Sequence, residues 1–345
     1  MRAAVIISLI SLLVSLLIGE AYLRLNGYAP KAAWVNANFD GSNWGMEDPE
    51  LGWVNRPGVF ASLELNGAAM SFQPDHTRTS RPVKNVDGGR PADVLVVGCS
   101  YSQGYSVADA ETYPWRLGER FPGVIVDNFG TGGYGAAQAM MRLRKELAPG
   151  KPAPKLVIYG LIAHQLPRTV AEPGWVKYLT NSKGDMVIPP HVVVDADGRL
   201  AERPLETVPA WPLEHQSAVV SELHAAWLRH RLGDRGGQRA AAMIAAIRAM
   251  RDMTEARGGR FLVAVLDEMS FPEGKDDYDA VLAALKPAGI EHAKCVDAEY
   301  NASLGDYLVN PTGHPNGRAH QRWADCVAPW IAANLPPVSG GAVSP

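Results

Sequence analysis

The sequence predicts an α/β domain built around a parallel central sheet. Short apolar runs rich in β-branched residues alternate with helix-length segments from residue 91 to residue 335, which is the pattern of a parallel sheet covered by helices on both faces. Three of these runs, at residues 93–97, 124–128 and 155–160, lead directly into segments that contain Gly, Ser or His. Open α/β sheets bind their ligands at such strand ends.

The other elements follow in chain order from the same patterns. Helices are expected at about residues 113–120, 136–147 and 239–257 and from 316 to 334, and further strands at 260–266 and 294–296. In the helix at 239–257, Met243, Ile247 and Met250 fall on one face. Between residues 165 and 235 the α/β alternation stops, and short strands are expected at 177–179, 186–188 and 192–194. We therefore predict an insertion at about 165–235.

The segment GCSYSQG at residues 98–104 places Ser100 directly after the first predicted strand. Gly98 and Gly104 permit the tight turn that holds a serine hydroxyl at the carboxyl end of the strand. Ser100 is therefore either a nucleophile or simply the cap of the next helix. The nucleophile elbow GxSxG does not apply, because residue 102 is Ser.

A glycine-rich turn at residues 130–135 follows the second predicted strand and matches GxGxxG. A dinucleotide site also needs an acidic residue at the end of the next strand. Residues 157–160, Val-Ile-Tyr-Gly, offer none. We predict no bound cofactor.

Three segments together resemble the SGNH (GDSL-type) hydrolase family: GCSYSQG at 98–104, NFGTGGYG at 128–135 and HPN at 314–316. The resemblance implies a flavodoxin-like three-layer α/β/α fold and a serine hydrolase. It makes Ser100 the nucleophile and His314 the general base. The backbone N–H groups of Ser100 and Gly133 would form the oxyanion hole.

The chain departs from the family pattern at three places. Cys99 stands where the first block has an aspartate, and Ala163 and His164 stand where the third block has Asn-Asp. His164 is therefore the candidate for the side-chain oxyanion donor. No aspartate lies two or three residues before His314, so the third triad member is Asp306 or Asn310, or the site works as a Ser-His dyad.

Cysteine and histidine spacing predicts no metal site. Cys99, Cys295 and Cys326 form no CxxC pair, and HExxH is absent. Cys295 and Cys326 are either a disulfide formed in an oxidising compartment or two buried thiols.

The N-terminus is expected to be a membrane anchor. Residues 3–19 carry no charge and follow Arg2, as in a short membrane span. We predict a signal-anchor at 1–24 that crosses the inner membrane once and leaves the domain in the periplasm. Cleavage near residues 19–21, followed by secretion, is the alternative. A stalk and irregular lead-in is expected at 25–90, the α/β domain at 91–335, and a disordered tail at 336–345.

The resemblance and the anchor together predict an acyl or acetyl esterase that acts outside the cytoplasm on an O-acylated envelope or exported polysaccharide. Two alternatives stay open: an O-acyltransferase on a polysaccharide, and a non-catalytic carbohydrate-binding or assembly protein that keeps the fold. The expected partners are an acylated small molecule or glycan and the inner membrane. A net charge of −3 gives no basic surface for nucleic acid.

Overall fold

The computed structural model describes residues 2–30, 44–61, 69–81, 91–195, 197–267, 274–309 and 313–335. A five-stranded sheet forms its centre, in the order β13-β12-β7-β5-β6, and all neighbouring strands are parallel. The strands are β5 (Val94–Gly98), β6 (Val126–Asn128), β7 (Leu156–Leu161), β12 (Arg260–Val265) and β13 (Glu291–Lys294). The predicted fold class is confirmed.

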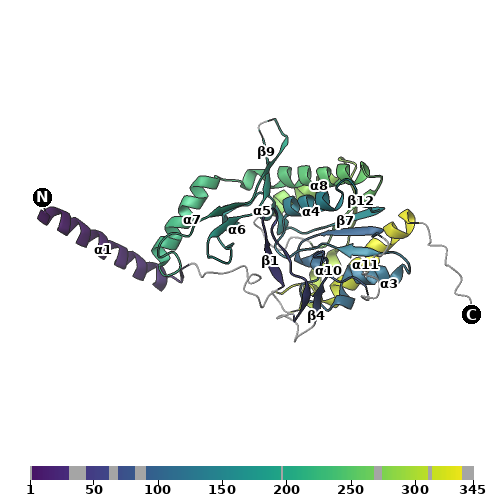
Figure 1. Cartoon of the computed structure of the whole chain (residues 1–345), viewed down its shortest axis with the longest axis horizontal. Helices are drawn as coiled ribbons and strands as arrows, with labels where there is room; N and C mark the ends of the chain where they lie inside the picture. The colour runs from purple at the N-terminus through teal and green to yellow at the C-terminus, as the bar shows by residue number, and fades with distance from the viewer. Residues whose placement is uncertain are drawn as a thin grey trace, which may run out of the picture.

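Helices cover both faces of the sheet (Figure 1). On one face lie α4 (Ala136–Glu146), α8 (Arg239–Glu255) and α9 (Lys275–Leu285); on the other lie α3 (Tyr113–Arg120) and α11 (Gly317–Asn334). β5 and β7 are buried along their whole length, which explains why both are continuous apolar runs. Chain order reverses between β5 and β7, so this pair is the topological switch point where such sheets bind ligands.

Two sequence-based strand predictions were wrong. The last strand ends at Lys294 instead of beginning there, because β13 is a largely exposed edge strand and carries no apolar run of its own. Residues 177–179 follow the short helix α6 (Pro173–Val176) as a turn, and only an isolated bridge joins Thr180 to Met186.

The region predicted as an insertion forms an antiparallel layer beside the sheet. Its elements are α5 (Gln165–Thr169), α6, β8 (Met186–Ile188), β9 (His191–Val194), β10 (Leu200–Arg203), β11 (Glu206–Val208) and α7 (Ala218–Leu232). β8 pairs with β11 and β9 with β10. Helix α7 lies between this layer and the N-terminal helix, and its first residues contact the N-terminal helix (Figure 1).

The described part of the lead-in packs against the α/β domain. It forms two antiparallel hairpins, β1 (Gly45–Asp48) with β2 (Gly52–Asn55) and β3 (Gly58–Ala61) with β4 (Ala69–Phe72). Trp44 and Trp53, on or next to the first hairpin, are both buried. Both tryptophans are thus part of the packed interior of the molecule.

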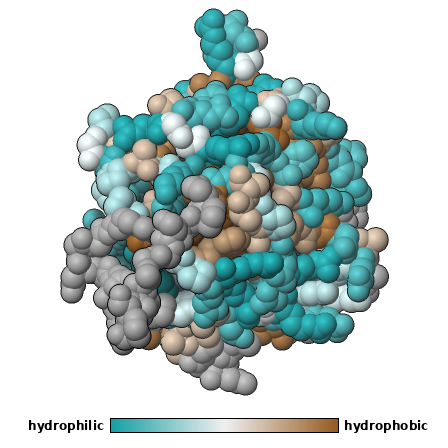
Figure 2. Space-filling view, turned by 90° about the vertical axis from the view of Figure 1, so that its right-hand side faces the viewer, coloured by the Kyte–Doolittle hydropathy of each residue, from teal (hydrophilic) through white to brown (hydrophobic). Residues whose placement is uncertain are grey.

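Helix α1 (Arg2–Leu25) projects from the domain (Figure 1). It is long and apolar enough to cross a membrane, a test that a signal sequence also meets. The face of the molecule seen from the side opposite α1 is mainly hydrophilic, with apolar residues in small separate areas (Figure 2). The predicted tail at 336–345 lies outside the described residues.

Candidate active site

Ser100 begins a short helix, α2 (Ser100–Gln103), at the carboxyl end of β5. The turn into this helix requires glycine at residue 98, where φ is +155°. A Cβ there would lie 2.5 Å from Ser102 Oγ and 3.1 Å from the Gly160 carbonyl oxygen. The close approach of β5, α2 and β7 therefore holds the Ser100 side chain at the switch point of the sheet.

His314 reaches Ser100 from the loop before α11. Its Nε2 lies 3.1 Å from Ser100 Oγ, within hydrogen-bond distance for a general base. The Tyr105 ring packs against the imidazole, with the centroids 4.7 Å apart. The structure thus brings together the two residues that the sequence separates by 214 positions.

Asn316, in the same HPN segment, holds this loop at two points. Its side-chain oxygen accepts hydrogen bonds from the N–H groups of Arg318 and Ala319 and so caps α11. Its Nδ2 donates to the carbonyl oxygens of Asp306, at 2.9 Å, and Leu308, at 3.1 Å. The cap explains why asparagine follows the histidine so closely.

The glycine-rich loop between β6 and α4 packs directly on α2. Asn128 Nδ2 donates to the Ser102 carbonyl at 2.7 Å, and the Thr131 N–H donates to the Gly98 carbonyl at 3.1 Å. A Cβ at Gly130 would lie 2.4 Å from the Gln103 nitrogen, so only glycine permits this contact. The loop and the serine turn are therefore joined by hydrogen bonds and close packing.

Gly133, the predicted oxyanion donor, is half-buried in this loop and has φ +80°. Two tryptophan rings flank it: a Cβ there would lie 3.1 Å from Trp53 Cζ2 and 3.6 Å from Trp175 Cζ2. Among the described residues, its N–H donates no backbone hydrogen bond. That group remains able to bind a developing oxyanion.

His164 precedes α5 at the end of β7, and its side chain is exposed. Desolvation by neighbouring atoms and the charges of Arg168 and His314 lower the pKa of His164 to about 4. The imidazole is thus neutral near pH 7, with one N–H to donate.

Asp267 is a residue that the sequence analysis missed. Its carboxylate accepts hydrogen bonds from the Ala163 N–H and the Tyr278 hydroxyl, both at 3.1 Å. It thereby fastens the turn that carries His164. Its position directly after β12, at the same edge of the sheet as Ser100, is the signal that would have found it.

Arg78 was missed as well, and the sequence contains no signal for it. Its fully buried guanidinium donates to the carbonyls of Gly104, at 3.0 Å, and Val107, at 2.8 Å, and pairs with Asp109 at 2.8 Å. Burial lowers the pKa of Arg78, and the Asp109 carboxylate opposes that effect. Arg78 thus fixes the turn that carries Tyr105 against His314.

Of the two candidates for the third triad member, the structure describes only Asp306. The Asp306 side chain is 65% exposed and lies 4.0 Å from Arg318, which gives no support to a role in orienting the imidazole. Asn310 lies outside the described residues. Cys99 is fully buried in the main apolar core, where burial raises the pKa of its thiol.

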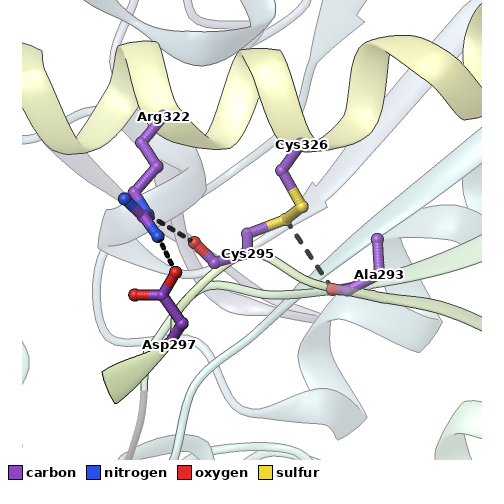
Figure 3. The surroundings of a disulfide bond; sticks show 5 residues. All are labelled: Ala293, Cys295, Asp297, Arg322 and Cys326. Carbon is purple, nitrogen blue, oxygen red and sulfur yellow. Dashed lines mark hydrogen bonds and ion pairs between the residues drawn. A yellow bond between two sulfur atoms is a disulfide. The ribbon is translucent and has the colours of Figure 1, made fainter. Parts of the chain in front are cut away.

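A disulfide links Cys295, just after β13, to Cys326 on α11 (Figure 3). The two Cα atoms are 5.4 Å apart, within the usual range for such a bond. Beside it, Arg322 of α11 pairs with Asp297. The bridge closes the stretch of chain that contains His314. Of the two alternatives for these cysteines, the structure has the disulfide.

Among the described residues, no group of three or more His, Cys, Asp or Glu side chains is arranged to hold a metal ion. Ser100 and His314 are instead arranged for proton transfer to and from a hydroxyl. The site supports nucleophilic catalysis by an activated serine.

No protein-family model and no curated protein matches the chain. Several solved structures do. One is a lipolytic protein of the G-D-S-L family from Veillonella parvula, at 10% identity, with a TM-score of 0.41, covering 71% of this chain and 100% of that one. A psychrotrophic esterase from Pseudoalteromonas sp. has 12% identity, a TM-score of 0.38 and coverages of 69% and 97%.

A catalytic mutant of an acetylxylan esterase from Geobacillus stearothermophilus is similar at 12% identity, with a TM-score of 0.39 and coverages of 71% and 95%. All three TM-scores lie below 0.5. What the chain can do chemically therefore follows from the geometry of its own residues.

Proposed function

We propose that this protein is a serine-dependent ester hydrolase of the SGNH type. The observation that carries the proposal is the 3.1 Å contact between Ser100 Oγ and His314 Nε2 at the switch point of the parallel sheet. A serine hydroxyl is a weak nucleophile near pH 7 and needs a neighbouring base. His314 is that base.

The reaction proceeds in two balanced steps. Ser100 Oγ attacks the ester carbonyl carbon while His314 Nε2 takes the hydroxyl proton, and collapse of the tetrahedral intermediate transfers this proton to the leaving alcohol. Water, deprotonated by the same imidazole, then attacks the acyl-serine carbonyl carbon, and His314 returns the proton to Ser100 Oγ as the acid leaves. The N–H groups of Ser100 and Gly133 and the neutral ring of His164 stabilise the oxyanion in both steps.

The site is proposed to work outside the cytoplasm. The Cys295–Cys326 disulfide supports an oxidising compartment. Contacts at the end of α1 support retention of the anchor: Glu20 accepts hydrogen bonds from the N–H groups of Ala218 and Val219, each at 3.0 Å. Cleavage near residue 20 would remove this cap from α7. With the domain held at the membrane, an O-acylated envelope polysaccharide is the proposed substrate.

The test uses the full chain in detergent and a fluorophosphonate probe, which reacts with activated serines. The wild type should be labelled, and Ser100→Ala and His314→Ala should not. Ser182→Ala, at an exposed turn of the insertion, is the matched control and should be labelled normally. A folded wild type that is not labelled would refute the proposal. Labelled protein is then assayed on acetylated sugars.

A further inference from the structure

The first hairpin of the lead-in, β1–β2, packs directly against the glycine-rich loop. Trp53 Nε1 donates to the Gly132 carbonyl at 2.8 Å, and Asn55 Nδ2 donates to the Gly130 carbonyl at 3.0 Å. A Cβ at Gly132 would lie 2.5 Å from the Trp44 ring. The segment DPELGWVN at residues 48–55 is therefore built against the predicted oxyanion loop.

The Trp53 hydrogen bond has a directional consequence. The Gly132 carbonyl and the Gly133 N–H belong to one peptide group, which is planar and trans, so the two point in opposite directions. A donor that holds the carbonyl on the hairpin side therefore turns the N–H to the other side. Trp53 is 1% exposed, so water does not compete for this bond.

In the nearby Gly130–Thr131 peptide, both the carbonyl and the N–H have hydrogen-bond partners. Asn55 holds the Gly130 carbonyl, and the N–H of that peptide, which belongs to Thr131, donates to the Gly98 carbonyl at the end of β5. In this peptide group, the hairpin holds the carbonyl and the N–H on the opposite side bonds the serine turn. Gln103 Nε2, on α2, donates to Asn55 Oδ1 at 2.7 Å and ties the hairpin to the nucleophile helix.

We infer that Trp53 is a positioning residue for catalysis: by holding the Gly132 carbonyl, its indole N–H aims the Gly133 N–H at the oxyanion formed on Ser100. This inference rests on the proposed esterase function and assigns a role to a segment outside the sequence blocks that resemble the hydrolase family. Trp53 touches no reacting atom, and its effect passes through one peptide group.

The test compares three variants of the full chain in detergent, with 4-nitrophenyl acetate as substrate. Trp53→Phe removes the donor and keeps an aromatic ring. Tyr134→Phe removes a hydroxyl that bonds the Trp53 carbonyl and leaves the indole bond to Gly132 intact. Trp115→Phe removes a buried indole N–H that has no hydrogen-bond partner in the described structure. Circular dichroism and thermal melting check that each variant folds.

For Trp53→Phe we expect kcat to fall by about 10- to 100-fold, with KM within about two-fold of wild type. The reason is that the Gly133 N–H stabilises the oxyanion, which develops in the transition state and not in the bound substrate. Tyr134→Phe and Trp115→Phe should keep kcat within about three-fold, since neither bonds the Gly132 carbonyl. A near-normal kcat in Trp53→Phe, or an equal loss in Tyr134→Phe, would overturn the inference.

A second measurement does not depend on the folding of a variant. In a crystal structure of the wild type with a phosphonate bound to Ser100, the phosphonyl oxygen should accept a hydrogen bond from the Gly133 N–H while Trp53 still bonds Gly132. An oxygen directed away from Gly133 overturns the inference even if the esterase function holds. If the folded wild type is neither labelled by the probe nor active on the ester, the proposed function is refuted, and the inference about Trp53 is refuted with it.

Discussion

His314 Nε2 lies 3.1 Å from Ser100 Oγ, although the two residues come from opposite ends of the α/β domain. Ser100 is held by the turn after β5, and His314 by the loop before α11, whose cap is Asn316. Both lie at the carboxyl edge of one parallel sheet, where chain order reverses. The contact is therefore a property of the sheet topology, and it accounts for the chemistry proposed for the site.

Replacing His164 tests the side-chain oxyanion donor. We expect His164→Ala to lower kcat on 4-nitrophenyl acetate by at least about ten-fold, because a donor to the oxyanion is lost. His164→Asn should retain more activity, since an amide also donates an N–H. His230→Ala, on an exposed position of α7, is the control. An alanine variant with unchanged kcat would show that His164 makes no such contact.

Replacing Arg78 tests the buried cation behind the site. Arg78→Met leaves three backbone carbonyls without this donor and Asp109 without its cationic partner, so the free energy of unfolding in urea should fall by about 3 kcal/mol. Arg199→Met removes an exposed pair with Asp197 and should change stability by less than about 0.5 kcal/mol. Equal stability of the two variants would contradict the structural role of Arg78.

Removing the disulfide should destabilise the fold around the loop that carries His314. The bridge joins residues 31 positions apart, and closing a loop of that length stabilises a fold by about 3 to 4 kcal/mol through the unfolded chain. The Cys295→Ser, Cys326→Ser double variant should unfold at lower urea. A reductant should lower the urea midpoint of wild-type unfolding toward that of the double variant. The midpoint of the double variant should not change with reductant. A wild type that is insensitive to reductant would mean that the bond does not form.

Acid should destabilise the fold through His320. Burial and the charges of Arg78 and Arg116 lower the pKa of His320 to about 3, and its Nδ1 accepts a hydrogen bond from the Tyr113 N–H at 3.2 Å. The unfolded state, with a histidine pKa near 6.5, binds a proton that the folded state excludes.

The contribution of His320 is therefore complete above about pH 6.5 and is lost as the pH falls toward 3, on the order of a few kcal/mol. His164 and His191, whose pKa values are lowered to about 4, act in the same direction. Urea titrations at several pH values give the free energy of unfolding as a function of pH. This free energy should fall less steeply with decreasing pH in His320→Gln than in wild type. Identical slopes would mean that His320 does not stay neutral in the folded state.

Local features of the sequence determined the strands β5, β6 and β7 and the helices α4 and α8, and the resemblance to a hydrolase family pointed to Ser100 and His314 as the candidate catalytic pair. A strand buried on both faces must be apolar throughout, and a helix must repeat its apolar residues at its own period, so both leave a pattern that a short window contains. The edge strand β13 left none, because its residues are mostly exposed. It was misplaced for that reason.

The contacts made across long stretches of chain were decided only by the tertiary structure. Ser100 and His314 are 214 positions apart in the sequence, and Trp53 and Gly132 are 79 apart. The bonds from Arg78 to the turn that carries Tyr105 likewise join separate segments of the chain. No local pattern encodes such contacts, because the hydrogen-bond partner of a carbonyl or a guanidinium depends on which segments the folded sheet brings side by side. The sequence therefore determined which residues could do the chemistry, and the packing of the sheet, the hairpin and α11 decided how they meet.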